Sequence, residues 1–284
     1  MALLPTKSEI HNFVVKYNHV NKKPLLLATF LLSFFIIKAQ DEDYVRSPTE
    51  NIGESQVKKF NLAVSLGPAF PIQAFASTNI KGSMWDFNSP DSTTLRGFAQ
   101  TGYHFDVSLS YLITSDFGII FYYGGNSNNF DAGSFSSAIG FPTSNTSGPY
   151  YTAEYLVGAF VNLPISERLN FKLSALIGLV TNTYPTLSVN LNDTIMIQRT
   201  VSGGAGLGYS FGASLTYSLS ENINIALNCS YTGSTINYAG WSETDYITFP
   251  SLGVTGSATL DHSAAIGTMQ TGIIKPSIGI ELKF

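Results

Sequence analysis

The chain has 284 residues, of which 44% are hydrophobic and only 12% are charged, and its formal net charge is −4. An acidic balance of this kind argues against a nucleic-acid-binding protein, and no run of about 20 apolar residues beyond the N-terminal region argues for membrane-spanning helices. Glycine (25), tyrosine (15) and phenylalanine (20) are abundant, which favours many strands over helices.

The first 39 residues have the zones of a secretory signal peptide. Lysines precede an apolar run over 25–37, and Ala39 stands where a signal peptidase would cut. The run is too short to span a bilayer comfortably, although a retained anchor helix is the alternative. The single cysteine, Cys229, is far from this site and offers no lipid attachment there. We therefore predict a signal peptide over 1–39, a short polar periplasmic tether over 40–56, and the main domain over 57–284.

From Phe60 onward, apolar residues alternate with polar or small residues in eight segments. The segments cover 60–66, 103–111, 117–124, 151–161, 169–179, 207–217, 223–231 and 274–284. In the last of them every even position is apolar, and the chain ends on Phe284. A period of two predicts strands, and the two faces of each strand meet different surroundings.

The connections between these segments are of two kinds. Tight turns follow the second, fourth and sixth segments, whereas long polar connections cover 71–97, 125–149, 181–203 and 233–271. Short turns on one side and long loops on the other are typical of outer-membrane barrels, with the turns in the periplasm. An even number of strands then places both termini in the periplasm.

Aromatic residues fall near the ends of the predicted strands, where hydrocarbon meets lipid headgroups. The predicted outer girdle is Phe70, Tyr103, Tyr123, Tyr151, Tyr209 and Tyr231, and the inner girdle is Phe60, Tyr111, Phe117, Phe171, Tyr217 and Phe284. A soluble β-sandwich or lipocalin-like barrel is the alternative fold. It would not explain why the opposite face carries so few charges.

The alternation, the loop asymmetry and the final Ile278-Gly279-Ile280-Glu281-Leu282-Lys283-Phe284 make residues 57–284 resemble the outer-membrane-protein β-barrel domain family. OmpA-type and PorT-like barrels are related to it in form. The resemblance implies an all-β fold, an eight-stranded antiparallel up-and-down barrel in the outer membrane of a Gram-negative cell. It also implies that Ile280, Leu282 and Phe284 belong to the signal read by the barrel assembly machinery.

The polar strand faces supply a small set of charged or titratable residues to the barrel interior: His104, Asp106, Glu154, Lys172, Lys275, Glu281 and Lys283. Charges removed from water must pair or be hydrogen-bonded, so we expect opposite charges at two depths. Asp106, Glu154 and Lys275 fall in the outer half, and the remaining lysines and Glu281 fall near the periplasmic end. A gate or ion path is the alternative interpretation.

The long loops could carry a binding function. Their aromatic residues are candidates for surface contacts, or else they pack loop against loop: Trp85, Phe87, Phe130, Phe135 and Trp241. The expected partners are outer-membrane lipid, the assembly machinery during biogenesis and an unidentified extracellular ligand or protein.

An enzyme is a further alternative, since some eight-stranded outer-membrane barrels modify lipid with a serine, a histidine and an acid. Beyond the signal peptide only two histidines remain, His104 and His262. His262 lies between Asp261 and Ser263, and adjacent residues seldom form a triad. We therefore expect no enzyme, no metal site and no cofactor. The predicted function is a monomeric barrel with a structural or cell-surface interaction role, and a narrow solute channel is the alternative.

Overall fold

The computed structural model describes residues 59–81, 83, 94–145, 148–191, 194–249 and 254–284. The predicted signal peptide and tether, and parts of the long connections, lie outside these residues. No helix in the described part of the chain is long and apolar enough to cross a membrane.

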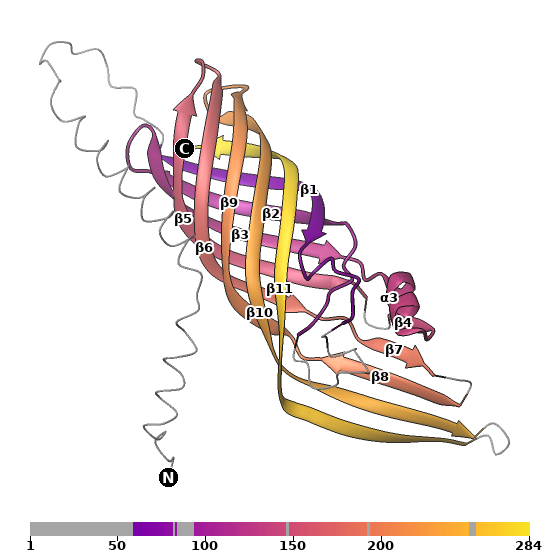
Figure 1. The fold of residues 1–284 in the computed structure, drawn as a ribbon. Coiled ribbons are helices and arrows are strands. Elements are labelled where there is room, and N and C mark those ends of the chain that lie inside the picture. The colour runs from indigo at the N-terminus through magenta and orange to yellow at the C-terminus, as the bar shows by residue number, and fades with distance from the viewer. Residues whose placement is uncertain (1–58, 82, 84–93, 146–147, 192–193, 250–253) are drawn as a thin grey trace, which may run out of the picture. The chain divides into compact units, whose positions relative to one another are not determined.

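Eight antiparallel strands form a closed ring (Figure 1). In ring order they are β11 (Val254–Lys283), β1 (Phe60–Ile72), β2 (Gly102–Leu112), β3 (Phe117–Asn128), β5 (Tyr150–Pro164), β6 (Leu169–Thr183), β9 (Gly204–Ser218) and β10 (Ile223–Phe249). β11 pairs with β1 on one side and with β10 on the other, so the ring has no open edge. The predicted eight-stranded up-and-down barrel is confirmed, and each predicted segment matches one ring strand.

The two faces of the ring differ as the alternation predicts. Large apolar side chains stand exposed on the outer face; examples are Leu66 (64% exposed) and Leu227 (57% exposed). All the predicted girdle aromatics are exposed or half-buried on this face. An apolar surface that encircles the molecule is unfavourable in water and fits the hydrocarbon of a bilayer. The fold is therefore a transmembrane β-barrel.

The two ends of the barrel differ in their connections. The turn end carries the tight turns and Phe284, and the loop end carries the long connections. At the turn end Phe60 and Phe284 exchange backbone hydrogen bonds of 3.0 and 2.9 Å, and their rings stack 6.1 Å apart. Ile280 and Leu282 face outward in the same strand. Their role as an assembly signal stays a prediction.

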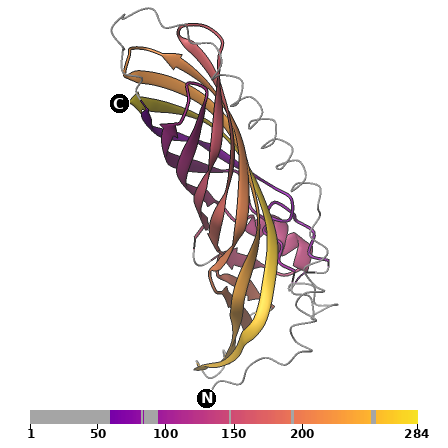
Figure 2. The same cartoon turned by 90° about the vertical axis from the view of Figure 1, so that its left-hand side faces the viewer.

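Much of the long polar connections is regular structure, which corrects the prediction of irregular loops. β10 has 27 residues and β11 has 30, whereas about 9–11 residues suffice to cross a bilayer. Most of residues 233–271 form a hairpin that continues both barrel strands (Figures 1 and 2). β8 (Ile195–Val201), β7 (Leu187–Asn190) and β4 (Thr143–Asn145) extend this hairpin into a sheet in the order β11, β10, β8, β7, β4, which we call the loop-end sheet.

A short helix, α3 (Ala132–Ile139), also replaces part of a predicted loop. Asp131 caps it by accepting a hydrogen bond from the Ser134 backbone N–H at 2.9 Å. Gly140 ends it in the left-handed region, at φ 78°. The helix buries Phe135 and Ile139, so it is anchored by packing rather than by its own length.

Candidate functional site: the barrel interior and its mouth

A buried ion pair crosses the lumen in the half toward the loop end. The Lys275 Nζ on β11 lies 2.5 Å from the Glu154 Oε2 on β5, and these strands stand opposite each other in the ring. Both side chains are sequestered, with 1% of Lys275 and none of Glu154 exposed. The pair therefore braces the two sides of the barrel across its interior.

Neutral groups complete the cluster around Glu154 and Lys275. Glu154 also accepts from the Asn126 amide at 2.7 Å and from the Thr232 hydroxyl at 3.0 Å. Lys275 donates to the Tyr122 hydroxyl at 3.0 Å. A buried ion pair costs desolvation free energy unless further hydrogen bonds satisfy its atoms, and here strands β3 and β10 supply them.

A second ion pair lies near the turn end. Lys172 Nζ on β6 is 2.6 Å from Glu281 Oε2 on β11, and Asn224 donates to the other oxygen at 3.0 Å. The Lys172 ammonium also lies 5.2 Å from the centre of the Phe160 ring. Lys283 is half-buried at the end of β11, from which its charge acts on Glu281.

Between the two levels lies a cavity of about 90 Å³. Its lining includes many hydroxyls, and it touches Lys172 and Glu281 as well as Asp106 and Tyr122. A polar space of this size has room for a few water molecules. The interior therefore holds a polar cavity that is lined in part by the Lys172–Glu281 pair.

His104 and Asp106 lie on one side of the lumen, in the half toward the loop end. Since a carbonyl can only accept, His104 Nδ1 donates to Pro68 O at 3.1 Å, which leaves Nε2 3.5 Å from Asp106 Oδ2. Asp106 Oδ1 accepts from the Ser65 hydroxyl at 2.6 Å. The serine thus bonds to the acid and not to the histidine, so these three residues do not form the serine–histidine–acid order of a hydrolase.

The mouth at the loop end is covered by a strap, residues 94–100. Its backbone bonds to β11 through Leu95 N and Thr268 O (2.8 Å), and to residues after β1 through Ala99 N and Phe75 O (2.9 Å). Phe98 packs edge-on against Phe135 of α3, with ring centres 5.1 Å apart. The strap is therefore joined to the barrel on several sides.

Tyrosine hydroxyls hold the strap on the side that faces the barrel interior. Tyr150 donates to the Gly97 carbonyl at 2.5 Å and Tyr184 donates to the Arg96 carbonyl at 2.8 Å. Tyr238 donates to the Asn182 side chain at 2.6 Å. The three rings pack edge to face in a row and are all buried. Aromatic side chains therefore fill the space between Glu154 and the strap. Sequence alternation missed this cover, because Tyr184 and Tyr238 lie in segments that were predicted as long loops.

The predicted surface aromatics divide into three groups. Phe130 and Phe135 are 7% and 0% exposed, and their ring centres lie 5.3 Å apart, so of the two alternatives they follow packing of loop against loop and not surface contact. Trp85 and Phe87 lie outside the described residues. Trp241 belongs to β10, and its backbone pairs with His262 of β11 and Val201 of β8. The structure describes the backbone of Trp241 and His262 and not their side chains.

The described residues contain no group of three or more His, Cys, Asp or Glu side chains that could hold a metal ion. A scan against protein-family models finds no match, and a search of curated proteins finds none either.

Known structures with a similar course of the chain are bacterial outer-membrane proteins. Neisserial surface protein A is 16% identical, with 79% of this chain and 97% of that chain covered and a TM-score of 0.38. Ail of Yersinia pestis is 10% identical, with 79% and 99% covered and a TM-score of 0.36. The outer membrane protease OmpT of Escherichia coli is 9% identical, with 80% and 97% covered and a TM-score of 0.41.

The closed strand pairing, the apolar outer face and the polar interior are properties of the chain itself. By its fold, the chain is an eight-stranded β-barrel protein of the outer-membrane type.

Proposed function

We propose that this protein is a non-conducting outer-membrane barrel that serves the cell envelope structurally and presents the loop-end sheet to partners outside the cell. The observation that carries the proposal is the Glu154–Lys275 pair, which joins opposite strands across the lumen with both side chains buried. The turn end and both ends of the mature chain are proposed to face the periplasm.

The interior argues against a narrow solute channel. An eight-stranded barrel is just wide enough for its own side chains, and here Phe160, Leu156 and Tyr122 point inward among the charges. A permeating ion would have to separate the Glu154–Lys275 pair and then pass the strap and its tyrosines. At both places the lumen is occupied by protein groups that are bonded to each other and not by water.

The loop-end sheet supports the interaction role. It contains strand residues in excess of those needed to cross a bilayer, so the sheet stands in water beyond the membrane. The Arg199 and Glu243 side chains form an ion pair across β8 and β10, which helps to hold the sheet in one shape. A rigid sheet that projects from a barrel is a suitable platform for binding another molecule.

Single-channel recording in planar bilayers tests the central claim. The purified, refolded protein should show rare openings or none. The Lys172→Ala, Lys275→Ala double variant should open more often, because unpaired carboxylates draw water and cations into the lumen. Steady, large conductance from the unmodified protein would overturn the proposal in favour of the channel.

A further inference from the structure

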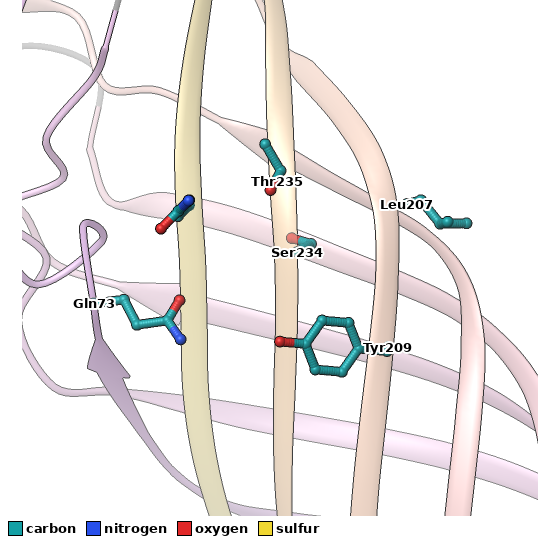
Figure 3. Close-up of a pocket in the computed structure, with 6 residues that line it drawn as sticks. Gln73, Leu207, Tyr209, Ser234 and Thr235 are labelled. Atoms are coloured by element: carbon teal, nitrogen blue, oxygen red, sulfur yellow. The ribbon is translucent and has the colours of Figure 1, made fainter. Parts of the chain in front are cut away.

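A pocket of about 230 Å³ lies on the outer wall of the barrel, where β9, β10 and β11 run side by side (Figure 3). It is lined by Gln73, Leu207, Tyr209, Ser234, Thr235 and Gln270. Most of these residues can form hydrogen bonds, and none is charged. The wall around the barrel is otherwise apolar, so a polar hollow on this face calls for a polar neighbour.

Two glycines beside the pocket let polar side chains lie close against the wall. Gly272 of β11 and Gly233 of β10 are paired in register, and Gly233 is paired in turn with Tyr209 of β9. A Cβ atom on Gly233 would lie 2.8 Å from the Tyr209 hydroxyl. One on Gly272 would lie 3.0 Å from the Gln73 side chain. The missing side chains therefore give Gln73 and Tyr209, which line the pocket, room to lie against the strands.

Those polar groups are held in place. Gln73 has φ 62°, which is uncommon for a residue other than glycine, and its side chain crosses Gly272 to donate from Nε2 to the Tyr231 hydroxyl at 2.9 Å. The Tyr209 and Tyr231 rings stand 6.0 Å apart. Thr235 and Gln270, paired in register, border the hollow on the side toward the loop end.

The level of the pocket along the barrel indicates which part of the membrane lies beside it. Tyr209 and Tyr231 belong to the aromatic girdle near the loop end, and such girdles lie at the level of lipid headgroups. An anionic headgroup would favour a lysine or arginine, and the pocket has none. Amide and hydroxyl groups beside aromatic rings instead match a neutral ligand with many hydroxyls. The volume is below the range of about 300–1,000 Å³ for drug-sized ligands, which fits a single ring.

We propose that this pocket binds one sugar ring of a glycolipid in the leaflet at the loop end. The amides of Gln73 and Gln270 and the hydroxyls of Tyr209 and Thr235 bond to the sugar hydroxyls, and the acyl chains lie along the apolar wall below. The proposal depends on the barrel's place in a membrane and not on whether the barrel conducts.

The test uses the full barrel in nanodiscs made from equal parts of monogalactosyl diacylglycerol, phosphatidylglycerol and phosphatidylcholine with the same acyl chains. Native mass spectrometry then counts the lipids that stay bound. The wild type should retain one galactolipid in preference to the other two. Equal retention of all three headgroups would overturn the proposal, and so would a preference for phosphatidylglycerol.

Two variants locate the site. Tyr209→Phe with Thr235→Val removes two hydroxyls without changing shape and should lower galactolipid retention about tenfold, as the loss of two neutral hydrogen bonds predicts. Gly233→Val should abolish retention by displacing the Tyr209 and Tyr231 side chains that lie over Gly233. Tyr103→Phe is the matched control, since Tyr103 is an exposed girdle tyrosine away from the pocket, and it should retain lipid like the wild type. Unchanged retention in the double variant would contradict the assignment.

Discussion

The two ion pairs of the lumen are built from the same chemistry but stand in different surroundings. Glu154 and Lys275 are completely enclosed, and Glu154 accepts from three donors. Lys172 and Glu281 keep 12% and 6% of their side chains exposed, and Glu281 accepts from two. Water can therefore replace part of the second pair but none of the first.

This difference indicates what each pair contributes. In the enclosed pair, loss of one partner leaves a charge with no solvent, so the two residues depend strongly on each other. In the pair at the turn end, solvent can reach a remaining charge, and screening reduces the contribution of the pair. The strap adds a further asymmetry, because packed aromatic rings cover the loop end in the part of the chain that the structure describes.

The largest expected effect is that of Lys275→Ala. It leaves Glu154 buried and unpaired, so the free energy of unfolding should fall by about 3–5 kcal/mol, measured by denaturant titration in lipid vesicles. The control is Glu154→Gln with Lys275→Met, which removes both charges and should recover most of the loss. A Lys275→Ala protein as stable as the wild type would show that the pair is not enclosed.

Tyr150→Phe tests the cover of the mouth. The variant keeps the ring that packs against Phe75 but leaves the buried Gly97 carbonyl without the tyrosine donor. The expected loss is about 1–3 kcal/mol, with faster proteolysis of the strap. Tyr151→Phe, in an exposed neighbour on the outer face, should change neither property. Equal proteolysis of Tyr150→Phe and the wild type would mean that the hydroxyl does not hold the strap.

The barrel and the placement of its ion pairs could be predicted from the sequence. Alternation identifies which residues face the lumen, and the order of the strands places Glu154 and Lys275 at one depth. The barrel follows from these local patterns, since each strand needs only its own period of two. Even the two-level arrangement of charges was accessible in this way.

The cover of the mouth was not accessible, because it depends on contacts between segments far apart in the chain. Phe98 has φ 47°, a backbone state that no alternation predicts. The strap is fixed by Tyr150 of β5 and by Tyr184, which follows β6. The extension of β10 and β11 was missed for another reason. Its glycine, serine and threonine residues are typical of loops, and the pairing of the two strands with each other overrides that composition.

Lys172→Ala should have a smaller effect than Lys275→Ala. The exposed fraction of the pair lets water solvate Glu281, and Asn224 still donates to it, so about 1 kcal/mol should be lost. High salt should reduce the difference between this variant and the wild type, whereas it should leave the effect of Lys275→Ala unchanged. Equal losses in the two variants, with equal salt dependence, would remove the distinction between the pairs.

The smallest effect concerns Asp131, at the edge of the mouth. The hydrogen bond from the Ser134 backbone N–H, followed by that from the Ser134 hydroxyl, lowers the pKa of this carboxyl from its usual value. A lowered folded pKa means that the stabilisation of α3 is fully present above the unfolded pKa of about 4 and is lost as the pH falls through the folded pKa. Because the carboxylate is largely exposed, the contribution should stay below about 1 kcal/mol.

Hydrogen exchange at the Phe135 amide, which bonds to the Asp131 carbonyl, reports on this turn. Asp131→Asn keeps a capping side chain without the titration, so the ratio of wild-type to variant exchange should rise as the pH falls below about 4 and stay constant above it. The intrinsic pH dependence of exchange cancels in that ratio. A ratio that is flat throughout the acid range would mean that the ionised carboxylate adds nothing to the cap, and α3 would then depend only on the packing of Phe135 and Ile139 beneath it.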